Sequence, residues 1–201
     1  MAQNNKNDEL FSINIGYGQN FYAIDVFSNA SKKYAQSMQK GFVCDFSYIN
    51  RLAYRLELGL ENSTFISSGN HQYGKDIFIT NFLSFHTGFV MINQENKRLS
   101  LSTGPGFMLL RDIGTIFGKP RDVKGFTVGW KFSLNGYYFF NKNIGISYGG
   151  SIILSSLENI RINYHNEIFK YQLNNPYTDD YSSIFGNLAR LNLSIGICYK
   201  L

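Results

Sequence analysis

Apolar and polar residues alternate with a period of two along most of the chain, and this period is typical of β-strands rather than helices. The clearest run covers residues 191–201, where every second residue is apolar: Leu191, Leu193, Ile195, Ile197, Tyr199 and Leu201. It is long for a strand of a soluble sheet, where about five or six residues are typical. A strand tilted across a bilayer needs about nine to eleven residues. The run therefore predicts a strand that crosses a membrane.

Seven further segments show the same alternation, with bulky apolar residues on one face and mostly small or polar residues on the other: 11–17, 42–48, 54–61, 77–91, 99–109, 126–135 and 144–154. The segment 77–91 is the least regular, because Asn81 falls on its apolar face while Phe78 and Phe82 fall on its polar face. The eight segments predict an all-β fold, an eight-stranded antiparallel up-and-down transmembrane β-barrel. We expect one barrel domain over residues 10–201, preceded by a flexible tail over residues 1–9.

The connections between these segments alternate between short and long. Short turns are expected around 49–52, 93–97 and 141–143, and long polar loops at 18–40, 66–76, 111–124 and 157–187. In an up-and-down barrel this order places the short turns and both chain termini at one rim, and the long loops at the other. Outer-membrane barrels have this asymmetry, with short periplasmic turns and long extracellular loops.

Composition indicates which face of the strands meets lipid. Charged residues make up 16% of the 201 residues, against roughly 25% in an ordinary soluble domain. No apolar run approaches the ~18 residues of a membrane-spanning helix, so a helical membrane protein is excluded. Eight strands enclose a space that side chains just fill, which suits the Gly- and Ser-rich face. We therefore expect the apolar face to meet lipid, with an aromatic girdle at the short-turn rim: Tyr48, Tyr54, Tyr138, Phe140 and Tyr199.

Charge and cysteine content narrow the function classes. The 19 basic and 14 acidic residues give a net charge of +5, but Lys and Arg are scattered singly apart from Lys32-Lys33 and Lys97-Arg98. No basic stripe follows a nucleic-acid backbone, so we expect no nucleic-acid partner. Cys44 and Cys198 fall on opposite faces of different segments, which predicts two unbridged, buried thiols. Residues 1–6 lack the apolar core of a signal peptide, and we expect a mature chain whose leader has been removed.

Three segments carry a resemblance to a known family: 99–107, 125–134 and 193–201. With them the chain, from about residue 10 to its end, resembles the small outer-membrane β-barrel proteins of Gram-negative bacteria, in particular the outer membrane protein beta-barrel domain of Bacteroidetes, often labelled porin family. The resemblance implies a location in the bacterial outer membrane and contact with its lipid bilayer. It also implies that the last strand is the assembly signal for the barrel-insertion machinery, carried here by Tyr199 and by Leu201, which replaces the usual terminal aromatic. It implies no particular activity.

Five charged residues fall on the face assigned to the lumen, namely Asp45, Arg55, Glu57, Glu61 and Lys131. Buried charges must be paired, so we expect a salt-bridge network that plugs the barrel. Pairing across the first short turn would set Asp45 opposite Glu57. A narrow gated or proton-conducting path is the alternative, whereas a wide pore is not expected at eight strands.

Ser84 and His86 lie two residues apart on the same lumen face. Their order is the reverse of the His-x-Ser pair in outer-membrane lipid A deacylases, and their parity directs them away from lipid. We therefore expect them to be polar lumen residues, with no catalytic site. The histidine and acidic residues of the loop 157–187 lack metal-ligand spacing, so no metal site and no cofactor are expected.

These observations predict an outer-membrane barrel with a plugged lumen, acting as an envelope structural or surface-interaction protein or as a narrow channel. Aromatic and basic residues interleave in the loop 157–187, which predicts either an extended hairpin that binds a protein or a glycan, or packing over the barrel mouth. Two other classes stay open. One is a soluble lipocalin-like barrel that binds an apolar ligand, and the other is an outer-membrane lipid hydrolase.

Overall fold

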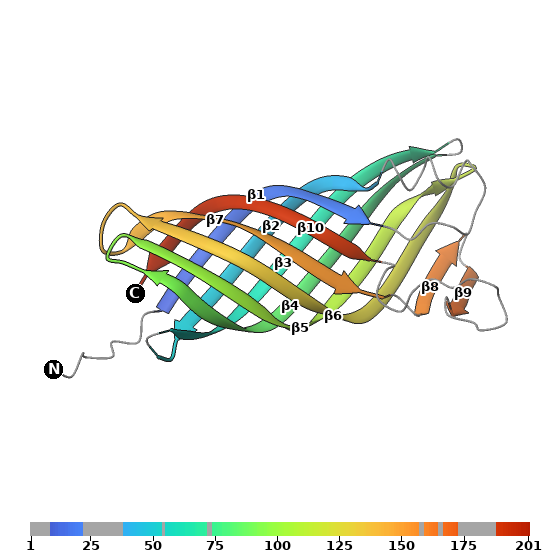
Figure 1. Ribbon diagram of the computed structural model, residues 1–201. Helices are drawn as coiled ribbons and strands as arrows, with labels where there is room; N and C mark the ends of the chain where they lie inside the picture. The colour runs from blue at the N-terminus through green and yellow to red at the C-terminus, as the bar shows by residue number, and fades with distance from the viewer. Residues whose placement is uncertain are drawn as a thin grey trace.

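Eight strands form the wall of a barrel in the computed structural model, which describes residues 9–21, 38–53, 55–71, 74–156, 159–164, 167–172 and 188–201. They are β1 (Glu9–Phe21), β2 (Lys40–Arg51), β3 (Leu56–His71), β4 (Gly74–Asn93), β5 (Lys97–Ile116), β6 (Lys119–Phe139), β7 (Ile144–Ser155) and β10 (Ala189–Lys200). Figure 1 shows them as a tilted cylinder. The tail expected over residues 1–9 lies almost wholly outside the described residues.

The barrel is closed and antiparallel. The sheet order is β5-β4-β3-β2-β1-β10-β7-β6, and an additional β5–β6 pairing joins its two ends. The first and last strands of the wall, β1 and β10, pair from Leu10↔Lys200 to Phe21↔Ala189. The predicted eight-stranded up-and-down barrel is thus confirmed. Among the described residues, no helix is long and apolar enough to cross a bilayer.

The two faces of the wall differ as the alternation predicts. Ser12, Glu57 and Lys131 point inward and are at most 2% exposed, whereas outward residues such as Ile197 are up to 68% exposed. We call the exposed apolar residues that surround the barrel the apolar belt; it includes Ile13, Ile15, Phe46, Phe85, Phe107, Leu109, Phe126, Val128, Trp130, Phe132, Leu193, Ile195 and Ile197. A soluble lipocalin-like barrel would bury these side chains around its ligand, so the belt excludes that alternative and fits a lipid environment.

The two rims differ in a way that the sequence predicted only in part. The short turns lie at the same end as both termini (Figure 1). At the other end, the predicted loops 66–76 and 111–124 are mostly strand, because β3 continues to His71 and β5 to Ile116. Polar residues on both faces of these stretches hide the alternation, yet the backbone ladder continues without a continuous apolar face. The long connections predicted there are present, but mainly as extensions of the strands.

The hairpin predicted within residues 157–187 is present as two short strands, β8 (Asn159–Tyr164) and β9 (Glu167–Gln172). The first of these pairs with β6 from Gly125↔Ile160 to Arg121↔Tyr164, in line with β7 along the same strand. The second pairs with β8. We call the ends of β4, β5 and β6 beyond the apolar belt, together with β8 and β9, the outer sheet (Figure 1). Residues 173–187 lie outside the described residues.

Apolar side chains fill the lumen in two layers. The inner layer lies near the short-turn rim and contains Leu10, Ile49, Tyr137, Phe139 and Cys198. The outer layer lies near the opposite rim and contains Met38, Val43, Phe65, Phe78, Phe82, Met108, Leu110, Ile153 and Leu188. Phe78 and Phe82, which break the alternation of their strand, are thus interior packing residues. The polar centre of the lumen is covered at both ends.

Candidate functional site

The centre of the lumen contains two buried ion pairs. Arg98 on β5 donates to the Glu57 carboxylate on β3, and Lys131 on β6 donates to the Glu61 carboxylate, also on β3. All four side chains are at most 7% exposed. An unpaired charge here would carry a desolvation penalty of several kcal/mol, so the two partners of each pair compensate each other. The arrangement ties β3 across the lumen to β5 and β6.

A third cation, Arg190 on β10, organises the layer above these pairs. Its guanidinium donates to Thr80 Oγ1 and to Ser63 Oγ, both at 2.7 Å. It also stands 5.5 Å from the centre of the Phe65 ring, at the boundary with the outer apolar layer. Asp45 lies opposite Ser63 in the β2–β3 register and is 4% exposed. Arg190 and Asp45 therefore both lie next to Ser63 in this layer.

The remaining free space in this polar centre is small. A cavity of about 10 Å³ is lined by side chains that include Asp45, Glu61 and Lys131. This is about the volume accessible to the centre of a single water molecule. No solute larger than water fits there while the ion pairs hold.

The structure brings together most, but not all, of the predicted charges. Asp45, Glu57, Glu61 and Lys131 lie in the lumen. Arg55 does not: it is exposed in the β2–β3 turn, with its guanidinium 5.7 Å from the centre of the Phe89 ring. The reason is register. The turn lies around residues 52–55, so Asp45 is opposite Ser63 and not Glu57.

Sequence reasoning missed the two arginines that complete the lumen network. Arg98 and Arg190 are 5% and 1% exposed. Each lies one residue before the start of its predicted segment. Each also lies two residues before an inward residue, Ser100 or Asn192, and therefore faces the lumen as well. Extending each segment to the first charged residue of matching parity would have found both.

Ser84 and His86 point into the lumen, away from lipid, and are at most 4% exposed. Ser84 Oγ donates to the backbone carbonyl of Glu61 at 3.5 Å. The His86 ring lies over Gly59, its register partner on β3, where a Cβ atom would overlap it. The hydroxyl and the ring therefore do not form the nucleophile and base of a lipid hydrolase.

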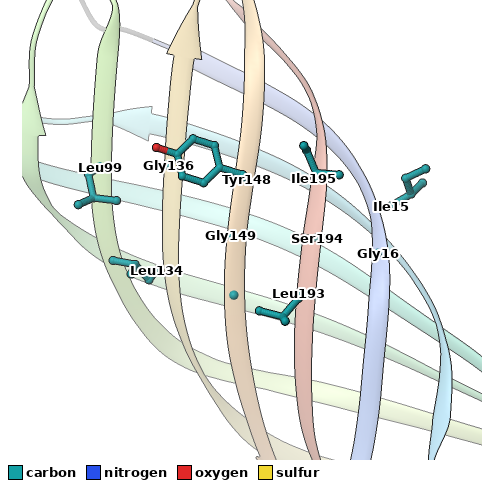
Figure 2. A pocket seen from close by; sticks show the side chains of 11 residues that line it. Ile15, Gly16, Leu99, Leu134, Gly136, Tyr148, Gly149, Leu193, Ser194 and Ile195 are labelled. Atoms are coloured by element: carbon teal, nitrogen blue, oxygen red, sulfur yellow. The ribbon is translucent and has the colours of Figure 1, made fainter.

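The lipid-facing wall has an apolar hollow of about 490 Å³ across β6, β7 and β10 (Figure 2). It arises where Gly136 and Gly150 take outward positions that bulky residues hold elsewhere in the belt. Tyr148 lies across Gly136 from the neighbouring strand, and Leu134 and Leu193 flank the hollow (Figure 2). Its walls offer almost only carbon, so it is part of the surface that lipid chains cover.

The cysteines are unbridged, as predicted. Cys198 is buried in the inner apolar layer, but Cys44 is exposed on the outward face of β2. The prediction that both thiols are buried is therefore wrong for Cys44, because its apolar face meets lipid and not the protein interior.

No family model matches the chain, and no curated protein is similar to it in sequence. Solved structures are similar in fold. A major outer membrane protein from Thermus thermophilus superposes with a TM-score of 0.63 at 11% identity, over 95% of this chain and 99% of that one. Neisserial surface protein A gives 0.58 at 11% identity, over 96% of this chain and 97% of that one.

Ail of Yersinia pestis, solved with the heparin analogue sucrose octasulfate, gives a TM-score of 0.54 at 11% identity, over 96% of this chain and 99% of that one. Identity at this level shows the fold alone. The fold and the apolar belt, taken together, are those of the small β-barrels that span the bacterial outer membrane.

Proposed function

We propose that this chain is a plugged outer-membrane barrel that acts at the cell surface through its outer sheet. The observation that supports this proposal best is the filling of the lumen, where two apolar layers enclose a paired polar centre. A barrel closed in this way conducts no solute without rearrangement of its interior. Its function then lies in what it presents outside the membrane or in the stability of the envelope. We assign it no catalytic role.

The outer sheet is built to hold its shape. Arg121 on β6 donates to Asp76 on β4 and, at 2.6 Å, to Asp112 on β5. On the opposite face, Arg111 on β5 makes two hydrogen bonds to Asp122 on β6, at 3.0 and 3.1 Å. Ion pairs on both faces fix the strands beyond the belt. A fixed platform loses less conformational entropy on binding than a loose loop.

Conductance measurements in a planar bilayer distinguish a plugged barrel from a narrow channel. We expect the refolded wild-type protein to give no discrete openings. Phe82→Ala, which thins the outer apolar layer, is expected to produce them, whereas Phe85→Ala removes a lipid-facing ring from the same strand and should leave the bilayer silent. Discrete openings in the wild-type protein would contradict the proposal and establish a channel.

For the partner of the outer sheet, we propose an extracellular glycan or protein, and heparin is the first probe because the similar Ail barrel was solved with a heparin analogue. Bacteria that display the wild-type chain should bind immobilised heparin more strongly than bacteria that display a chain with residues 159–172 replaced by a short Gly-Ser link. Heat-modifiable gel migration checks that the barrel of both chains is closed. If both kinds of bacteria are retained equally on heparin, the hairpin is not the binding site.

Two finer assignments complete the proposal. The segments 99–107, 125–134 and 193–201 support membership of the Bacteroidetes-type outer membrane protein beta-barrel domain, labelled porin family. The last strand supports recognition by the barrel-insertion machinery, because Tyr199 is 45% exposed on its outward face and the C-terminal Leu201 is exposed at the rim. We propose no nucleic-acid partner.

A further inference from the structure

Four basic residues occupy directly opposed positions on four neighbouring strands of the outer sheet. Arg111 on β5 is opposite Lys124 on β6, which is opposite Arg161 on β8, which in turn is opposite Lys170 on β9. Opposed residues of antiparallel strands lie on the same face, with Cβ atoms about 4.5–5.5 Å apart. We call these four register positions the basic row.

The described side chains of the basic row, those of Arg111, Lys124 and Arg161, are on the outward face and next to the apolar belt. The Arg111 and Lys124 side chains are 52% and 59% exposed, and Arg161 is exposed as well. Two residues closer to the membrane on the same face are Leu109 and Phe126, which are opposite each other and 57% and 56% exposed. Two residues of an antiparallel strand span about 7 Å. The row therefore lies at the height where lipid headgroups meet the belt.

Opposed like charges destabilise a sheet, so the row needs anions. Asp122 supplies one: it accepts two hydrogen bonds from Arg111, and Lys124 Nζ lies 3.3 Å from its Oδ2. The hydrogen bonds from Arg111 hold the pKa of Asp122 below its ordinary value of 3.8, so this carboxylate is charged at neutral pH. Within the described part of the chain, Asp122 is the acidic residue that pairs with the Arg111 and Lys124 side chains. One carboxylate beside the basic side chains of Arg111, Lys124 and Arg161 leaves a positive excess.

We propose that the basic row binds the phosphate groups of anionic lipids in the outer leaflet, while the belt below it contacts their acyl chains. Guanidinium and ammonium groups are the side chains that bind phosphate best, and Lys124 and Arg161 project from neighbouring strands at headgroup height. The adjacent belt decides between lipid and a soluble polyanion, because a lipid fills the phosphate site and the apolar surface at once. The site is independent of the plug, but Arg161 and Lys170 belong to the hairpin that is also proposed to bind a glycan or protein.

Native mass spectrometry of the detergent-refolded protein tests this proposal. The probes are phosphatidylglycerol and phosphatidylcholine with identical acyl chains. We expect the wild-type chain to retain phosphatidylglycerol in preference. Each Lys or Arg near a membrane surface contributes about fivefold to the binding of anionic lipid, so Lys124→Gln/Arg161→Gln should weaken retention roughly twenty-five-fold. Lys119→Gln/Lys142→Gln is the matched control, because it removes the same charge from two exposed positions outside the row.

Asp122→Asn tests whether removal of a negative charge beside the row strengthens the binding of anionic lipid. It removes the carboxylate that pairs with Arg111 and Lys124, so phosphatidylglycerol retention should rise by about fivefold. Equal retention of the two lipids, or equal losses in the row variant and its control, would overturn the proposal. So would a row variant that loses sucrose octasulfate but keeps phosphatidylglycerol, which would assign the row to a soluble glycan.

Discussion

At the scale of single residues, the lumen depends on charges that are buried together with their partners. Lys131 and Glu61 are 70 positions apart in sequence and 2% and 7% exposed. Neither has access to bulk water, so the charge of each is stabilised only while the other is present. Glu61 also lies beside the cavity that Asp45 lines, which places a second acid close to it.

We therefore expect Lys131→Met to lower the free energy of unfolding by about 3–5 kcal/mol, because it leaves Glu61 as an uncompensated buried charge. Urea unfolding of the protein refolded into lipid vesicles measures this change. Adding Glu61→Gln to the same chain should recover most of the loss, since the double variant buries no unpaired charge. Arg55→Met is the control and should change little, because Arg55 is exposed at the turn. If the free energy of unfolding falls equally in the single and double variants, the loss comes from packing and not from the unpaired charge.

At the scale of elements, the β5–β6 hairpin shows how strands extend beyond the membrane. Its loop has only two residues, Phe117 and Gly118, with φ of 51° and 74°. Two positive φ values define the type I′ turn, which matches the right-handed twist of paired strands and favours Asn followed by Gly. Phe117 is therefore in a conformation that its side chain does not favour.

Phe117→Asn should stabilise the outer end of this hairpin, because Asn adopts a positive φ at lower cost than Phe. We expect slower hydrogen exchange of the Ile116 and Lys119 amides, which flank the loop, by about two- to fivefold, with the rest of the barrel unchanged. Gly118→Ala should have the opposite effect, since a Cβ atom is strained at its φ of 74°. Faster exchange in Phe117→Asn would contradict this account of the turn.

The stability of the same hairpin should depend on pH. Hydrogen bonds from Arg111 lower the pKa of Asp122, and the contribution of Asp122 to stability is therefore present above the ordinary pKa of 3.8. It is lost as the pH falls through the lowered pKa of the folded state. Hydrogen exchange of the hairpin amides, corrected for intrinsic rates, should accelerate on acidification past that value. Asp122→Asn should exchange faster at neutral pH and lose this acceleration.

At the scale of the whole molecule, one pairing closes the barrel. The first and last strands meet along their full length, and the Leu201 amide donates to the Glu9 carbonyl at 3.0 Å. Closure therefore requires that β10, the last strand of the wall, pairs with β1. Exposed aromatics at the same rim, Tyr138, Phe140 and Tyr199, are in place for the predicted interfacial girdle, whereas Tyr54 lies outside the described residues.

Tyr199→Asn separates the assembly signal from the stability of the barrel. We expect it to reduce the amount of folded protein in the outer membrane severalfold, while refolding of the purified chain in detergent changes little. Tyr148→Asn is the matched control, because Tyr148 is an equally exposed outward tyrosine on the neighbouring strand. If both variants assemble equally well in cells, Tyr199 is not part of a signal.

The sequence predicted the face of the strand on which a residue lies better than it predicted which residues are opposite each other on neighbouring strands. Parity is local, so residues 42–48 and 126–135 were assigned to the correct faces, and even Phe78 and Phe82 were placed inward. Register is not local. It depends on where each turn falls. The sequence placed the first short turn a few residues too early, so it predicted Asp45 opposite Glu57 and Arg55 in the lumen, whereas Asp45 is opposite Ser63. The outer ends of β5 and β6 were taken for loops because their alternation lacks an apolar face outside the membrane.

The sequence by itself determined the number of barrel strands, the face of each that meets lipid and the presence of polar groups in the lumen, because a period of two is written in consecutive residues. Only the tertiary structure decided which charges meet. Glu57 pairs with Arg98, which is 41 residues away, and Arg111, Lys124, Arg161 and Lys170 form a row although each is isolated in the sequence. The physical reason is that such partners are set by the register between strands, and register is fixed only when the turns form and the barrel closes.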